Sequence, residues 1–171
     1  MNSQKKQIEG IFKYPKYSHM GVSDKSLVRG FILEINKQGD VKIFRKQLES
    51  IIEKTIKLSN VEFFGTLDVS LAFVSQKEIR KINRIYRKKD EVTDILSFSD
   101  FMGEGKKVSG RDRISCELII CHPYLEKKHK NSETSIQEET AYIISHGVLH
   151  CLGLKHSEKM YRIQEKVCEQ I

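Results

Sequence analysis

The sequence lacks the features that typify membrane and secreted proteins. It has no run of about 18 apolar residues, the length that a membrane-spanning helix needs, and no apolar stretch typical of a signal peptide. None of its four cysteines forms a C-x-x-C pair, and without a secretion signal we expect them to stay reduced. We interpret Cys116 and Cys121, which lie in an apolar run, as small buried residues. These absences predict a cytoplasmic protein with no membrane partner.

The length and charge of the chain indicate its domain organisation and the kind of partner it could bind. The chain has 171 residues, of which 39% are hydrophobic, enough to bury the core of one domain. Residues 1–27 are polar and aperiodic, so we expect a flexible N-terminal extension followed by a single domain over residues 28–171. Lysine and arginine number 30 against 23 acidic residues, a net charge of +7. Such a charge suits a polyanionic partner such as nucleic acid.

The hydrophobic pattern mixes two periodicities. We expect strands over residues 28–35, 66–74, 93–98 and 114–121, with a loop at 99–113. The spacing predicts helices over residues 41–59, 77–87, a short stretch after Pro123, 135–152 and 157–170. Two S-x-x-E capping boxes, Ser75 with Glu78 and Ser135 with Glu138, support two of these helix starts. Because strict βαβ alternation is missing, we predict an α+β fold with a small mixed sheet of about four strands and about five helices.

The segment HGVLHCLGLKH, residues 146–156, contains three histidines. His146 and His150 are four residues apart and so share one helix face. Gly153 can take the positive φ that ends a helix, which would bring His156 back to the same point. Three imidazoles leave the fourth position of a tetrahedral metal open to water, the arrangement of a catalytic zinc site. Nickel and other divalent metals also accept imidazole ligands.

The residue after the first histidine distinguishes this segment from a zinc protease. Such proteases have glutamate there, in H-E-x-x-H-x-x-G-x-x-H, as the base of peptide cleavage. Here Gly147 occupies that position. Phosphodiester cleavage depends more on neutralising phosphate charge, which a metal and an arginine can supply. The segment therefore favours phosphate chemistry, unless a carboxylate from elsewhere, such as Glu117, replaces the missing base.

Two segments together resemble the YbeY family of bacterial single-strand endoribonucleases and rRNA maturation factors. The family pattern H-G-x-L-H-L-x-G-y-D-H is matched by residues 146–156, with Lys155 in place of aspartate and Cys151 in place of an aliphatic residue. The pattern N-x-x-Y-R-x-x-D-x-x-T-D-V-L-S-F is matched by NRIYRKKDEVTDILSF, residues 83–98. In the family's G-D-I-x-I strand this chain has Cys116 and Glu117. The resemblance covers about residues 28–171.

The resemblance implies a function and a set of site residues. His146, His150 and His156 would bind one zinc ion on a metzincin-like helix, with nickel as an alternative metal. Arg87 and His146 would be catalytic, with a metal-bound hydroxide attacking the phosphate or activating a nucleophile while Arg87 stabilises the charge. The expected roles are 16S rRNA 3′-end maturation and quality control of the small ribosomal subunit. From its position alone, Arg87 could instead cap its helix or pair with Asp90.

Basic residues cluster around Arg87 and offer a path for RNA phosphates. The expected RNA-binding residues are Arg80, Arg84, Lys88, Lys89, Ser97 and Lys155. A solvated helix face is the alternative interpretation of this charge. Tyr86, Phe98, Phe101 and Tyr124 could stack on bases or could belong to the core.

Two other functions remain open at this point. The first is a metallopeptidase in which Glu117 or another acid acts as the base. The second is a non-enzymatic ribosome-assembly factor, in which zinc stabilises the fold and the basic face binds RNA.

Overall fold

The computed structural model describes residues 30–37, 41–61, 65–100, 112–130 and 134–171. The expected N-terminal extension, residues 1–27, lies outside this part, as do Phe101 and most of the expected loop at 99–113. The division into an extension and one domain therefore stays a prediction.

Four strands in the described residues form one mixed sheet in the order β1-β2-β4-β3. They are β1 (Gly30–Lys37), β2 (Gly65–Phe73), β3 (Ile95–Ser99) and β4 (Asp112–Ile120). β1 runs parallel to β2 and β2 parallel to β4, whereas β3 pairs with β4 antiparallel, with Ile95 opposite Ile120. The prediction of a small mixed sheet in an α+β fold is confirmed.

Five helices accompany the sheet in the described residues: α2 (Arg45–Ser59), α3 (Gln76–Arg87), α4 (His122–His129), α5 (Ile136–Cys151) and α6 (Glu158–Cys168). The side chain of Ser75 accepts a hydrogen bond from Glu78 N at the start of α3, and Ser135 forms a full capping box with Glu138 at the start of α5. α2 begins four residues later than predicted, at Arg45. The ammonium group of Lys37 donates to the carbonyl oxygens of Val41 and Ile43, which holds this connection outside the helix.

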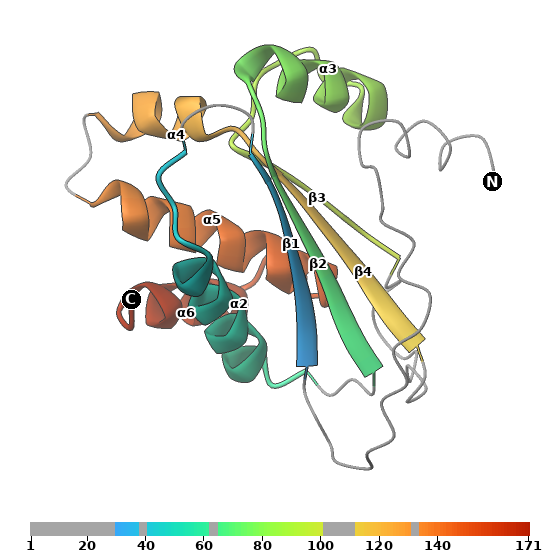
Figure 1. The fold of residues 1–171 in the computed structure, drawn as a ribbon, viewed down its shortest axis with the longest axis vertical. Helices are drawn as coiled ribbons and strands as arrows, with labels where there is room; N and C mark the ends of the chain where they lie inside the picture. The colour runs from blue at the N-terminus through green and yellow to red at the C-terminus, as the bar shows by residue number, and fades with distance from the viewer. Residues whose placement is uncertain (1–29, 38–40, 62–64, 101–111, 131–133) are drawn as a thin grey trace.

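The helices lie on both faces of the sheet (Figure 1). The main core contains the β2 residues Leu67, Val69, Leu71 and Phe73, as their alternation predicts, together with residues of α2, α5 and α6. A smaller cluster on the other face joins α3 to Ala72 and Ile119. The far face of β2 is therefore covered near its end. Cys116 and Cys121 are fully buried free thiols, as predicted.

The helix that carries two of the histidines, α5, packs unusually close to the sheet at Gly147. A Cβ atom added to this glycine would lie 2.6 Å from Cδ2 of Leu118 and 2.9 Å from Cδ1 of Ile95. Both distances are far below normal van der Waals contact, and Leu118 is fully buried. The position that holds the catalytic glutamate of zinc proteases therefore faces the sheet here, and a side chain would fit only if the ends of Leu118 and Ile95 moved.

We expect Gly147→Ala to destabilise the protein by about 1–3 kcal/mol, the usual effect of overpacking a tight core. At an unhindered position in a helix, replacing glycine by alanine stabilises the protein by about 0.5–1 kcal/mol. The sign of the change in unfolding free energy therefore distinguishes a crowded position from an open one. Urea denaturation measures the change. Gln137→Ala, at an exposed position of the same helix, is the control and should be near neutral. A Gly147→Ala protein as stable as wild type would contradict the close packing.

Candidate metal centre and cleft

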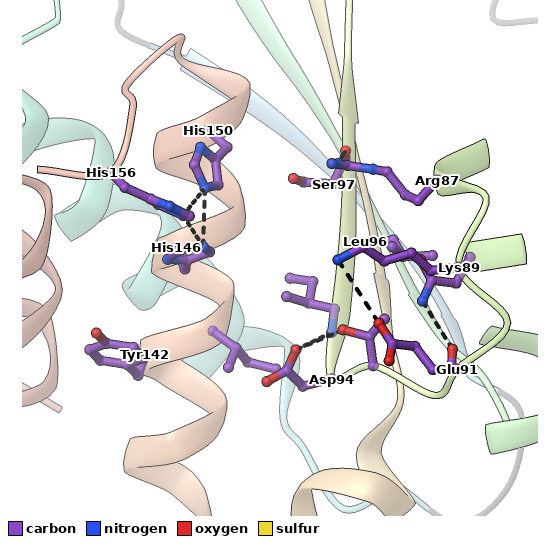
Figure 2. A pocket seen from close by; sticks show the side chains of 14 residues that line it. Arg87, Lys89, Glu91, Asp94, Leu96, Ser97, Tyr142, His146, His150 and His156 are labelled. Carbon is purple, nitrogen blue, oxygen red and sulfur yellow. Dashed lines mark hydrogen bonds and ion pairs between the residues drawn. The ribbon is translucent and has the colours of Figure 1, made fainter. Parts of the chain in front are cut away.

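The ring nitrogens of the three predicted ligands converge on one point (Figure 2). Nε2 of His150 lies 3.0 Å from Nε2 of His146 and 3.0 Å from Nε2 of His156, and the third distance, between His146 and His156, is 3.3 Å. In the described residues these three are also the only group of at least three histidine, cysteine or acidic side chains that could hold a metal ion together.

Local backbone structure brings the third histidine to the other two. His146 and His150 are one turn apart on α5, and the helix ends at Cys151. Gly153 has φ 83°, the left-handed conformation that glycine adopts without strain. Its N–H donates to the His150 carbonyl and that of Leu154 to the Leu149 carbonyl, which satisfies two carbonyls at the helix end. The reversed chain then presents His156 to the same point, as the spacing predicts.

The tautomer of His150 is determined by the hydrogen bond of its other ring nitrogen, Nδ1. Nδ1 lies 2.9 Å from the carbonyl oxygen of Leu154. A carbonyl can only accept, so Nδ1 carries the proton and donates it. The lone pair is then on Nε2, the nitrogen that faces the other two histidines. Histidines that bind metal ions are commonly oriented by such a hydrogen bond from the other ring nitrogen.

The arrangement fits a tetrahedral metal ion. Ligand nitrogens at about 2.0–2.1 Å from such an ion would be about 3.3–3.4 Å apart, close to the Nε2 separations of this cluster. Burial lowers the pKa of His146, and the neighbouring His150 lowers it further. Burial also lowers the pKa of His150. Both rings therefore favour the neutral form, which is the form that binds a metal.

A cleft of about 360 Å³ separates the histidines from the end of α3 and from β3. Arg87, the last residue of α3, crosses toward β3, and its Nη2 donates to the Ser97 carbonyl at 3.4 Å (Figure 2). Lys89 also lines the cleft. Arg87 and His150 line a second, adjoining hollow together with Ser97, Ser99, Cys151 and His156. The open side of the metal centre therefore faces a guanidinium group.

Asn83 holds the turn that positions these cations, a role that motif spacing did not reveal. Its side chain is buried and Nδ2 donates to the Glu91 carbonyl at 2.9 Å. Its own carbonyl accepts from the N–H groups of Lys88 and Lys89. Lys88 takes the left-handed conformation there, with φ 61°. This short turn ends α3 at Arg87 and returns the chain toward β3.

The predicted RNA-binding residues divide into two groups. Lys89 and Ser97 line the cleft, whereas Arg80, Arg84, Lys88 and Lys155 occupy exposed positions away from its lining. Arg80 makes a two-pronged ion pair with Asp90, at 3.0 and 3.1 Å. Asp90 is thus paired with Arg80 and not with Arg87, the partner that position alone had suggested. Contact of any of these residues with RNA stays a prediction.

The candidate stacking aromatics belong to the smaller core cluster. Tyr86, Phe98 and Tyr124 pack against it, and the rings of Tyr86 and Phe98 meet edge to face. An aromatic residue that the sequence did not single out lies closer to the metal centre. Tyr161 of α6 is 43% exposed and stacks beside His156, with ring centroids 6.3 Å apart.

The carboxylates also differ from expectation. Glu117 lies between Cys116 and Leu118, which face the main core, so strand alternation directs it to the opposite face from α5. It therefore cannot reach the histidines. Asp94 and Glu91 line the cleft instead. Asp94 also orders the turn into β3, because its Oδ1 accepts from Ile95 N at 2.9 Å.

None of the helices in the described part combines the length and apolar character needed to cross a membrane.

Comparisons with known proteins agree with this site. A family model described as Endoribonuclease YbeY matches residues 34–171. The endoribonuclease YbeY of Finegoldia magna is 35% identical over 133 residues, which cover 75% of this chain and 82% of that protein. The corresponding protein of Persephonella marina is 33% identical over 144 residues, or 80% and 90% of the two chains.

A solved structure shows a similar fold. The solution structure of TM1509 from Thermotoga maritima superposes with a TM-score of 0.50 at 27% sequence identity, covering 80% of this chain and 88% of that one. The family match extends over most of the chain and includes both the three histidines and the α3–β3 segment with Arg87. The chain therefore belongs to the YbeY family of endoribonucleases.

Proposed function

We propose that this chain is a zinc-dependent endoribonuclease that cuts single-stranded RNA in the cytoplasm. Its proposed substrate is the 3′ region of precursor 16S rRNA, with a role in quality control of the small ribosomal subunit. The observation that carries the proposal is the pairing of a three-histidine cluster with Arg87 across one cleft. Membership of the endoribonuclease family supports the same reaction.

His146, His150 and His156 would hold the ion through Nε2. When bound, zinc lowers the pKa of a coordinated water to about 7 and supplies the nucleophile for hydrolysis. Zinc is favoured because three neutral imidazoles with an open fourth position form its usual catalytic coordination. Three ligands with an open cleft are also unlike a structural zinc site, in which the protein fills all four positions. This argues against zinc as a purely structural element of an assembly factor.

Arg87 is placed to bind the phosphate. A guanidinium group keeps its charge at any physiological pH and can donate two parallel hydrogen bonds to phosphate oxygens. Its Nη2 donates a long hydrogen bond to the carbonyl of Ser97, which a phosphate could replace. Positive charge opposite the metal would stabilise the charge that builds up on the non-bridging oxygens during cleavage.

The shape of the site supports a single strand as substrate. The two adjoining hollows share Arg87, Ser97, His150 and His156, so together they form a continuous path past the metal centre. A cleft of this size can accept one nucleotide but not the width of a duplex, whose grooves and backbones a protein contacts from outside.

Peptide cleavage is less well supported. Gly147 occupies the position of the protease base and is packed against the side chains of Leu118 and Ile95, and Glu117 lies on the far face of the sheet. Asp94 is one of two acids in the cleft, with Glu91, that could take that role. Protein cleavage that is lost in Asp94→Asn but kept in Arg87→Ala would favour a peptidase.

The proposal can be tested with a closed circle of single-stranded RNA, which only an endonuclease can open. We expect the zinc-loaded protein to linearise the circle, to leave a matched duplex uncut, and to lose activity when the metal is removed. Restoring one equivalent of zinc should restore cleavage. Equal cleavage of circle and duplex would contradict the single-strand preference, and cleavage that persists without metal would contradict the proposed role of zinc.

Binding through the exposed basic residues of α3 should depend steeply on salt. We expect the affinity of metal-free protein for single-stranded RNA to fall as salt rises, with a log–log slope of about −0.7 per phosphate neutralised. Arg84→Ala should reduce that slope by about the same amount. A slope unchanged by this substitution would place Arg84 outside the RNA-binding surface.

A further inference from the structure

Gln164 is a fully buried polar side chain at the interface between α6 and α5. Its Nε2 donates to the carbonyl of Tyr142 at 3.4 Å. In an α-helix that carbonyl also accepts from the N–H of the residue four positions later, which here is His146. The amide group of Gln164 therefore lies beside the helical turn that leads from Tyr142 to His146, the first proposed metal ligand.

The oxygen of the same amide has no well-aligned partner. Oε1 of Gln164 is buried and accepts no hydrogen bond of good geometry within the described residues. A buried acceptor without a donor is costly, and native proteins keep few of them. Such an atom is expected to have a function or a partner that small movements would bring into line.

The donor that we consider for this oxygen is His146, one turn along α5 from the carbonyl that Gln164 contacts. Its Nε2 faces the other two histidines, so Nδ1 is the nitrogen that remains for another neighbour. Long side chains on a helix lean back over the preceding turn, which directs the His146 ring toward Tyr142 and the amide group of Gln164.

His150 shows why such an acceptor matters. Its Nδ1–H is held by the Leu154 carbonyl, which leaves the lone pair on Nε2. A neutral imidazole without an acceptor divides between two tautomers, and only one of them offers Nε2 to a metal. His146 requires an acceptor at Nδ1 for the same reason, and the nearby backbone of its own helix is already used in helical hydrogen bonds.

We propose that Gln164 is a positioning residue for the metal centre, whose Oε1 accepts the Nδ1–H of His146 and holds the ring in the tautomer that presents Nε2. α6 thus contributes to metal affinity although it supplies no ligand. The inference rests on the metal site of the proposed function, but it does not depend on RNA as the substrate.

The test uses Gln164→Met, which keeps the length of the side chain and removes the acceptor. The dissociation constant for Zn²⁺, measured by competition with a chelating dye, should rise about 10–100-fold, as for loss of other groups that orient ligands. Metal-free Gln164→Met should be as stable as wild type or more so, because an unpaired buried acceptor is removed. Gln164→Glu restores an acceptor and should bind zinc more tightly than Gln164→Met.

A second measurement determines the tautomer of the His146 ring directly. Nitrogen NMR of the histidine rings in metal-free wild-type protein, at a pH where they are neutral, should show His146 protonated at Nδ1. In Gln164→Met the same ring should become a mixture of tautomers. Gln137→Met, at an exposed position on α5, is the matched control and should leave the zinc affinity and the tautomer unchanged.

Three results would overturn the inference. The first is wild-type zinc affinity in Gln164→Met, and the second is a His146 ring protonated at Nε2 in metal-free wild type. The third is a loss of zinc affinity that only follows a loss of stability in the metal-free variant, since that would make Gln164 a packing residue. Wild-type protein that binds no zinc would instead contradict the proposed function, and the ring tautomer would still decide the contact with Gln164.

Discussion

Replacing His146 by alanine is expected to remove metal binding while leaving the fold intact. The ring would supply one of three ligands. Loss of a residue that only orients a ligand weakens metal binding by up to about 100-fold, so loss of the ligand itself should weaken zinc binding by more than this. The side chain is only half buried and lies at the cleft, so metal-free His146→Ala should unfold at nearly the same temperature as metal-free wild type. Metal content after dialysis against low zinc measures the effect.

Thermal stability gives an independent check on this variant. A ligand that binds only the folded state stabilises it in proportion to the logarithm of its concentration over the dissociation constant. Added zinc should therefore raise the melting temperature of wild type and have little effect on His146→Ala. His122→Gln, on α4 and outside the cleft lining, serves as the control and should respond like wild type. A normal response of His146→Ala to zinc would show that the ion binds elsewhere.

Replacing Arg87 by alanine is expected to have the opposite profile, with metal retained and cleavage lost. Removing one preformed donor to a developing negative charge typically lowers kcat by about 10²–10³-fold. Arg87→Lys keeps the charge but loses the paired donors, so it should recover only part of the rate. Single-turnover cleavage of a labelled single-stranded RNA measures both variants at full zinc occupancy.

Arg84→Ala is the matched control for this experiment. It removes the same charge from the same helix, but Arg84 is exposed and does not line the cleft. We expect weaker RNA binding with little change in the rate at saturating RNA. If Arg84→Ala and Arg87→Ala lower that rate equally, the effect reflects the general charge of α3, and Arg87 has no special place opposite the metal.

Local patterns predicted that the three histidines come together. The spacing of His146 and His150 depends only on helix geometry, and the return of His156 depends on a glycine whose left-handed conformation ends the helix. Both are properties of a short stretch of chain, so the sequence is sufficient to infer them. The starts of α3 and α5 were likewise predictable from their serine N-caps.

Contacts between distant segments were not predictable in the same way. Strand alternation places Glu117 on the face opposite Cys116 and Leu118, but periodicity does not specify that α5 packs on the face of those two residues. The proposed contact between Gln164 and His146 would join two helices, and a glutamine in a helix gives no indication in the sequence of the residue it contacts. Gly147 was noticed as a missing base, but its close approach to Leu118 appears only in three dimensions.

The glycine at position 147 also explains a difference in chemistry. In the protease pattern the residue after the first histidine must face the substrate side to act as a base. In this chain the same position faces β3 and β4, where helix and sheet touch. The cleft also contains Asp94 and Glu91, but Arg87 can bind a phosphate through two parallel hydrogen bonds, so the site is better suited to a phosphate than to a peptide.

The most direct test of the metal-centred account is a zinc titration of RNA cleavage. Metal-stripped wild type and His146→Ala, purified in parallel, would be titrated with zinc while the cleavage of a labelled single-stranded RNA is followed. We predict that wild-type activity rises in proportion to zinc and levels off at one equivalent, while His146→Ala stays inactive throughout. Cleavage that is equal in the two proteins, or that is independent of added zinc, would contradict the account.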